Sequence, residues 1–241
     1  MRPLSTGGTD LRHRHRAGAS IWWVSALLAG FAGLGVVAHG AKHGTALDHD
    51  VLRWMVDQRQ TWLTTIAIAI TNAGSPVAMG LLAVIVAAVL LWRRRSIIPG
   101  LVVVSTLAAA AGLSTLTKGV VGAQRPSRST QLVLEIDPSF PSGHVTGTLA
   151  LTGIVAVVLG RGQSVRTCVA LVAGVIVLTS AVALTRLYLG VHWLTDIGGG
   201  ILLGAAAVLV GALVLRKATI ARTGIGEDRN ESPATVASRV A

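Results

Sequence analysis

The sequence predicts an all-α membrane protein, a polytopic bundle of six transmembrane helices with a short interfacial helical segment between the first two. Hydrophobic residues make up 52% of the 241 residues and charged residues 13%, and the mean hydropathy of +0.67 is unlike that of a soluble domain. Several apolar runs reach the roughly 18 to 20 residues that a helix needs to cross the hydrocarbon core. The alternating strands of about ten residues that are typical of a membrane β-barrel are absent from the sequence.

Six apolar stretches are predicted to span the membrane. They are Ser20–Gly40, Pro76–Trp92, Ile97–Thr117, His144–Gly160, Thr167–Leu184 and Trp193–Leu215. Between the first two, Ala46–Ser75 is half polar, and its apolar part, Trp62–Thr71, is short for a span, so we interpret it as interfacial or re-entrant. If it crossed the membrane, the topology would invert beyond it. We expect one transmembrane domain, residues 20–217, between disordered cytoplasmic tails at 1–19 and 218–241.

The Lys and Arg residues are distributed unevenly between the two sides of this topology. Fourteen of the 21 fall in the two tails, in the connection between the second and third spans, and in that between the fourth and fifth. The positive-inside rule assigns these segments to the cytoplasm, so both termini are expected there, in a multi-pass protein of the plasma membrane. The net charge of +11 then reflects topology and does not indicate a nucleic-acid-binding surface.

Two further features of the apolar segments bear on cell location and cysteine chemistry. The basic and then apolar N-terminus resembles a signal peptide, with a passable cleavage site at Ala38-His39-Gly40. Its apolar run exceeds the roughly 7–15 residues of a signal sequence, so we favour an uncleaved anchor. The lone Cys168 excludes an internal disulfide and a cysteine-based metal site, and we interpret it as a small core residue.

Polar segments on the extracytoplasmic side carry the chemistry, because ionisable groups beside a membrane must be solvated, paired or used. In PSGH, Ser142 is expected to cap a helix, Gly143 lets another group approach the backbone, and the free N–H groups of the first turn favour an anion beside His144. The alternative is a capped helix whose histidine makes a local hydrogen bond.

His192 and Asp196 are four residues apart, which on a helix places both side chains on one face. The carboxylate can then accept one ring N–H and leave the other nitrogen as an oriented nucleophile, although a structural His–Asp pair is the alternative.

Three cations on the same side, Lys118, Arg125 and Arg186, are suited to phosphate oxygens. The alternative is that they snorkel to the interface, above all Lys118. We interpret the remaining charges, Arg128, Glu135 and Asp137, as solvated loop residues.

Taken together, these segments resemble the three-part signature of the type 2 phosphatidic acid phosphatase superfamily. The matching residues are Lys118, six residues, Arg125-Pro126; Pro141-Ser142-Gly143-His144; and Arg186, five residues, His192, three residues, Asp196. The match covers Lys118 to Asp196, and the upstream half is supported by hydropathy alone. The third motif of the family usually opens with Ser-Arg, whereas here Thr185 precedes Arg186 and retains a hydroxyl.

The resemblance implies a role for each matching residue. His192 would become a phosphohistidine, Asp196 would hold its ring, and His144 would act as acid and then as base. The phosphate would be held by Lys118, Arg125, Arg186, Ser142 and the Gly143 N–H. We expect no metal or other cofactor, because the cations neutralise the phosphate and the chain has no acidic cluster suited to Mg²⁺. Activity should be bell-shaped with pH, since the nucleophile must be neutral and the acid protonated.

The expected substrate is a lipid phosphate or diphosphate in the extracytoplasmic leaflet. The resemblance suggests phosphatidic acid, phosphatidylglycerol phosphate or polyprenyl diphosphate, and the sequence leaves this choice and the oligomeric state open. Alternative functions are a lipid phosphotransferase that uses the same histidine, and a non-enzymatic channel or scaffold, although the spans lack the row of ionisable residues that lines an ion pathway. The Ala/Gly/Val-rich helices and the excess of Arg over Lys suggest a bacterial source. Small residues at Gly198–Gly200 and Gly204 predict close helix packing.

Overall fold

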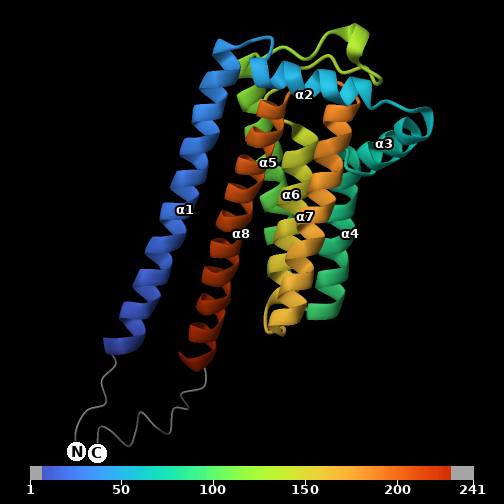
Figure 1. The fold of residues 1–241 in the computed structure, drawn as a ribbon. Helices are drawn as coiled ribbons and strands as arrows, with labels where there is room; N and C mark the ends of the chain where they lie inside the picture. Colours follow the sequence, from blue (N-terminus) through green and yellow to red (C-terminus); the bar gives the residue numbers. More distant parts are fainter. Residues whose placement is uncertain (1–6, 229–241) are drawn as a thin grey trace, which may run out of the picture.

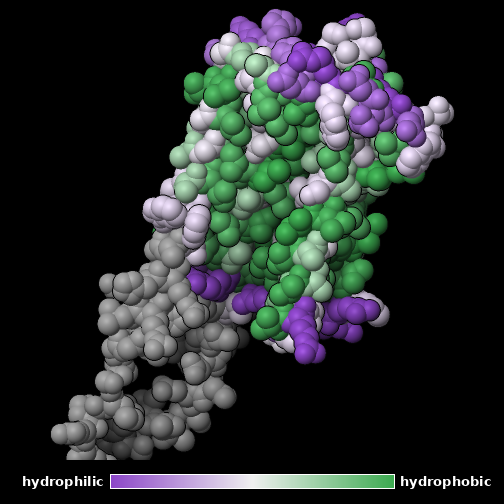
Figure 2. Space-filling model, in the orientation of Figure 1, coloured by the Kyte–Doolittle hydropathy of each residue, from purple (hydrophilic) through white to green (hydrophobic). Residues whose placement is uncertain are grey.

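The protein is a bundle of long helices in the computed structural model, which describes residues 7–228 and the side chains of residues 20–219. The helices are α1 (Gly7–Gly40), α2 (Ala46–Asp57), α3 (Thr61–Ala73), α4 (Pro76–Arg94), α5 (Ile98–Val121), α6 (Gly143–Gly160), α7 (Val165–Tyr188) and α8 (Leu194–Asp228), with a 3₁₀ turn η1 (Arg128–Thr130). Within this range, α1 and α4 to α8 are the six helices long and apolar enough to cross a membrane. Figure 2 shows the apolar band between two hydrophilic ends. The predicted six-span fold is confirmed.

Helix α6 lies at the centre of the bundle. It packs against α4, α5, α7 and α8, whereas α1 stands at the edge and packs mainly on α8 (Figure 1). This central position explains why the start of α6, which carries PSGH, is surrounded by other elements at one end of the bundle.

The short helices lie at that same end, which we call the site end. Helix α2 lies across it, and α3 runs obliquely toward the start of α4 (Figure 1). At 13 residues, α3 is too short to cross a membrane. The predicted interfacial segment is therefore present, and the inverted topology is not. Helix α2 begins with a capping box in which the side chains of Thr45 and Asp48 each accept a hydrogen bond from the other's backbone N–H.

Two spans extend further toward the site end than predicted. Helix α5 continues beyond Thr117 to Val121 and ends at Gly122, whose φ of +59° suits glycine. Helix α7 continues beyond Leu184 to Tyr188. Both extensions place a predicted site residue, Lys118 or Arg186, on the last turn of a helix.

At the opposite end, helices enter the segments predicted to be disordered tails. Helix α1 begins at Gly7 and α8 continues to Asp228, while residues 1–6 and 229–241 lie outside the described range. Hydropathy marks where a span leaves the membrane, but a helix satisfies its own backbone hydrogen bonds and can continue past that point.

The glycines at the start of α8 allow close packing, as predicted. A Cβ on Gly199 would lie 2.4 Å from the ring of Phe140, and one on Gly200 would lie 2.9 Å from the carbonyl oxygen of Ser142. The backbones of α8 and the start of α6 are thereby brought together, and with them two of the three motifs.

Candidate active site

The three polar segments meet at the site end. Lys118 is on the last turn of α5, Arg125 is in the loop that follows, Ser142, Gly143 and His144 begin α6, Arg186 is on the last turn of α7, and His192 and Asp196 lie at the start of α8. Lys118, Arg125, Gly143, His144 and His192 line one cavity of about 670 Å³. Arg186, Ser142 and Asp196 are buried, with 1%, 0% and 0% of their surface exposed.

The predicted His192–Asp196 pair is formed, although its local structure differs from the prediction. Helix α8 begins only at Leu194, so His192 precedes it. Asp196 Oδ2 accepts from the Trp193 backbone N–H at 2.8 Å and lies 3.1 Å from His192 Nδ1. Asp196 Oδ1 accepts from the Ser139 hydroxyl at 3.2 Å. The carboxylate thus closes the start of α8 and holds the imidazole at the same time.

Arg125 determines which nitrogen of His192 carries the proton. Its Nη1 lies 3.1 Å from His192 Nε2 and also donates to the Val191 carbonyl at 2.7 Å. A guanidinium only donates, so Nε2 is the acceptor and Nδ1 carries the hydrogen that Asp196 accepts. Burial, and then the positive charges of Arg125 and Arg186, lower the pKa of His192 well below its ordinary value. The imidazole is therefore neutral, with the Nε2 lone pair on the cavity side.

The three predicted phosphate-binding cations lie around this histidine and are paired with two carboxylates of the loop 122–142. Asp137 lies 2.9 Å from Lys118 Nζ and 2.7 Å from Arg125 Nη2. Glu135 lies 2.5 Å from Arg186 Nη2 and 3.7 Å from Arg125 Nη2. Lys118 Nζ also donates to the Pro138 carbonyl.

The prediction that Glu135 and Asp137 are unpaired, solvated loop charges is wrong, because both are ion-paired, although Asp137 is exposed like Arg128 and only Glu135 is partly buried. Burial raises the pKa of Asp137, but the hydrogen bond from Lys118 and the charge of Arg125 lower it by more, so the carboxylate stays ionised. Loop residues without periodicity give no sequence signal for such pairing, because the partners are set by the tertiary fold.

The start of α6 agrees with the prediction in position but not in hydrogen bonding. Ser142 is the N-cap residue, yet its hydroxyl makes no capping bond. Its backbone N–H donates to the Asp196 carbonyl at 3.1 Å, which ties α6 to α8. His144 follows in the first turn and faces the cavity.

Among the buried polar atoms that have no partner in the described part of the chain, two belong to predicted phosphate-binding residues, and a third lines the same cavity. They are Ser142 Oγ, Arg186 Nε and Ser114 Oγ. The other Arg186 nitrogens donate to the Thr71 hydroxyl at 2.8 Å and to Glu135. Buried polar groups are nearly always paired in folded proteins, so we expect these three atoms to be able to bind a ligand oxygen.

Thr185, which departs from the usual family pattern, is turned away from this chemistry. Its hydroxyl donates to the Val182 carbonyl at 2.7 Å within α7 and is buried. A serine could make the same bond, so we expect the threonine to leave the position of Arg186 unchanged.

Asp48 is a functional neighbour that the sequence analysis did not single out. It is 1% exposed and accepts from the Thr195 backbone N–H at 2.9 Å and from the Thr195 hydroxyl at 3.1 Å, in addition to its bonds with Thr45. It therefore joins α2 to the first turn of α8, next to Asp196. The T-x-x-D capping pattern was readable in the sequence, but the contact with α8 was not.

The cavity continues away from the charged groups as an apolar surface. Its walls there are Pro76, Met79, Gly80 and Ala83 of α4 and Val104, Leu107, Ala108 and Ala111 of α5. The cavity thus combines an end lined by two histidines, two cations and two carboxylates with an apolar groove.

Known proteins share both the sequence and the fold. The PAP2 superfamily model matches residues 99–220. Phosphatidylglycerophosphatase B of Bacillus subtilis is 31% identical over 150 residues, covering 61% of this chain and 72% of that protein. Decaprenylphosphoryl-5-phosphoribose phosphatase of Mycobacterium tuberculosis is 36% identical over 105 residues, covering 42% of this chain and 51% of that one.

Two solved structures share the fold. The crystal structure of a transmembrane PAP2-type phosphatidylglycerolphosphate phosphatase from Bacillus subtilis has a TM-score of 0.71 at 24% identity, covering 88% of this chain and 98% of that one. That of Aquifex aeolicus LpxE has a TM-score of 0.55 at 19% identity, covering 70% and 96%. The family match spans the three motifs and the helices that carry them, and the chain belongs to the PAP2 superfamily.

Proposed function

We propose that this protein hydrolyses a phosphate monoester or diphosphate of a membrane lipid at the extracytoplasmic face, through a phosphohistidine on His192. One observation carries the proposal: a single cavity joins both histidines and two of the three cations, Lys118 and Arg125, to an apolar groove between α4 and α5. The names of two relatives, a phosphatidylglycerophosphatase and a decaprenylphosphoryl-5-phosphoribose phosphatase, support a lipid phosphate as substrate. The excess of Lys and Arg at the opposite end supports the extracytoplasmic placement.

In the first step, Nε2 of His192 attacks phosphorus. The P–N bond forms as the bond to the leaving oxygen breaks, and His144 donates a proton to that oxygen, which leaves with the lipid. Arg125 Nη1 exchanges Nε2 for a phosphate oxygen and so frees the lone pair. Asp196 stabilises the positive charge that develops on the ring.

In the second step, His144 takes a proton from a water molecule that attacks the phosphohistidine. The P–N bond breaks, inorganic phosphate leaves, and His192 returns to its neutral form. Lys118, Arg125, Arg186, Ser142 and the Gly143 N–H hold the phosphate oxygens throughout. These cations supply the charge compensation, so the reaction is proposed to be metal-independent.

The test is phosphate release in detergent, with chelator present, from phosphatidic acid, phosphatidylglycerol phosphate and polyprenyl diphosphate. We expect His192→Ala to lose at least about 10³-fold in rate on each substrate that the wild type cleaves. His43→Ala is the matched control, because His43 is exposed in the connection between α1 and α2. Equal rates for His192→Ala and wild type would refute the site.

The intermediate can be tested separately. A phosphoryl group bound to nitrogen is stable in alkali and lost in acid, so wild type quenched during turnover should carry such a label and His192→Ala should not. Adding an alcohol acceptor separates hydrolysis from transfer, since a phosphotransferase would form phosphorylated alcohol in place of free phosphate. A channel or scaffold would give neither product.

A further inference from the structure

The phosphate-binding cations already have anionic partners within the chain. Asp137 contacts Lys118 and Arg125, and Glu135 contacts Arg186 and, at 3.7 Å, Arg125. We propose that Glu135 and Asp137 form an internal counter-anion that occupies these cations until substrate binds, and that displacing it sets a charge threshold for the phosphate groups that the site accepts. This inference rests on the proposed function.

The carboxylates occupy the positions that phosphate oxygens would take. Their oxygens lie 2.5 to 2.9 Å from one nitrogen of each cation, which is close enough for charge-assisted hydrogen bonds. Both residues line the cavity together with His144 and His192. A phosphate that takes up these same nitrogens of the three cations must therefore replace the carboxylates.

The two carboxylates are placed where they can leave without movement of a helix. Their side chains are 26% exposed for Glu135 and 49% for Asp137, whereas Arg186 and Arg125 are 1% and 7% exposed. The flanks of their loop are held independently: Arg59 Nη2 donates to the Thr130 carbonyl at 2.7 Å, and the Ser139 backbone N–H donates to the Ala123 carbonyl at 2.9 Å. Side-chain rotation toward solvent is thus sufficient.

The need to balance the charge of the cations makes the exchange selective for anions with two negative charges. The buried Arg186 is costly to leave unpaired, so an incoming anion must replace what the carboxylates supply. A monoester phosphate carries up to two negative charges and can replace both carboxylates. A phosphodiester carries one and would leave a cation without its partner. The exchange of carboxylates for phosphate therefore favours terminal phosphates over the singly charged phosphodiester groups of ordinary phospholipids.

The experiment measures inhibition of lipid phosphate hydrolysis by inorganic phosphate and by dimethyl phosphate. For the double variant Glu135→Gln/Asp137→Asn we expect the inhibition constant of phosphate to fall about tenfold, and dimethyl phosphate to inhibit the variant but not wild type. Asp137→Asn alone should give a change of about threefold in the same direction, since its half-exposed pairs are screened by water and salt. Asp57→Asn, which removes an exposed carboxylate of α2, is the control and should change neither constant.

An unchanged or raised inhibition constant in folded Asp137→Asn and in the double variant would overturn the inference. If Glu135→Gln prevents folding, as loss of a partner for Arg186 could cause, the single Asp137→Asn variant decides alone. The proposed function fails separately. Wild type would then release no phosphate from any lipid, while thermal stabilisation by inorganic phosphate, compared between wild type and Asp137→Asn, would still test the counter-anion.

Discussion

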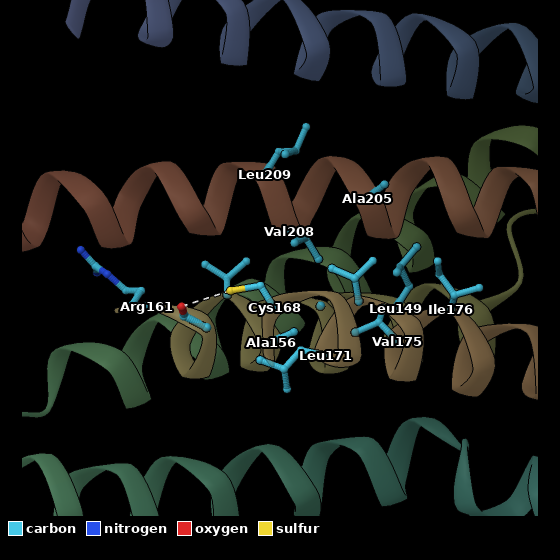
Figure 3. A pocket seen from close by; sticks show the side chains of 14 residues that line it. Leu149, Ala156, Arg161, Cys168, Leu171, Val175, Ile176, Ala205, Val208 and Leu209 are labelled. Carbon is cyan, nitrogen blue, oxygen red and sulfur yellow. Dashed lines mark hydrogen bonds between the residues drawn. The ribbon is translucent and has the colours of Figure 1, made fainter. Parts of the chain in front are cut away.

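Two cavities of similar size differ completely in chemistry. The site cavity has a volume of about 670 Å³ and is lined by two histidines, two cations and two carboxylates in addition to its apolar walls. The second, of about 590 Å³, lies between α7 and α8 over α6 and is lined mainly by Leu, Val, Ile, Ala and Gly residues (Figure 3). Arg161, at one end, is the one charged residue that lines this second cavity. The Cys168 thiol, in its wall, donates a hydrogen bond to the Gly160 carbonyl.

The comparison shows that volume does not identify the site in a membrane bundle. Small residues leave space between helices wherever lipid chains can cover it, and the groove of Figure 3 contains no arrangement of groups for binding an anion. The site cavity differs because ends of five segments converge there, and each brings a polar group that the fold must satisfy. Its properties should therefore depend on single buried polar atoms, whereas the apolar groove should tolerate change.

Removing a buried polar support gives the largest expected contrast. Asp48→Ala leaves the Thr195 N–H and hydroxyl, and those of Thr45, without their acceptor. We expect the free energy of unfolding to fall by about 2–4 kcal/mol, with a loss of activity as the first turn of α8 loosens. Thermal denaturation in detergent measures the first effect. Asp50→Ala removes an exposed carboxylate of the same helix and should change stability by less than about 0.5 kcal/mol.

Filling each cavity with the same substitution gives a smaller and more specific contrast. Ala111 lines the site cavity on α5, and Ala156 lines the apolar groove on α6. A leucine at 111 takes space that we assign to the lipid chain, so Ala111→Leu should raise KM about tenfold with little change in kcat. Ala156→Leu should leave both constants within about twofold. Equal effects of the two substitutions would contradict the assignment of the lipid-binding groove.

The last contrast is a pH dependence of stability from His192. Its pKa in the folded protein is lowered from the ordinary 6.5, mainly by burial, so below pH 6.5 the unfolded chain binds a proton that the folded protein does not. The contribution of neutral His192 to the free energy of unfolding is therefore complete above pH 6.5. It is lost as the pH falls, and the free energy of unfolding then decreases by at most about 1.4 kcal/mol per pH unit. Asp137, whose pKa is lowered from 3.8, contributes only at lower pH.

The measurement is thermal stability between pH 7 and 5. His192→Asn should show a weaker fall over this range than wild type, because asparagine does not titrate. His43→Ala should retain the wild-type dependence. A fall of equal slope in wild type and His192→Asn would show that other groups determine acid stability.

Local sequence patterns were sufficient to predict the features that depend on whether a segment lies in the hydrocarbon core or in water. The spans were readable because hydrocarbon requires long apolar helices, and α2 and α3 were recognised as non-spanning because their apolar run is short. The N-cap position of Ser142 was also readable, although its hydroxyl makes no capping bond. The His192–Asp196 pair was readable because residues four apart in the sequence supply that contact.

Contacts between distant segments required the tertiary structure. Four of the contacts at the site join residues that are far apart in the sequence, so no helical or strand periodicity predicts them. They are the ion pairs Glu135–Arg186 and Asp137–Lys118, the hydrogen bond from Arg125 to His192, and the hydrogen bonds from Thr195 to Asp48. The sequence shows which polar groups would be costly to bury without a partner, but not which partners they have. The partners depend on how the helices pack, and small residues such as Gly199 and Gly200 determine how closely the helices approach one another.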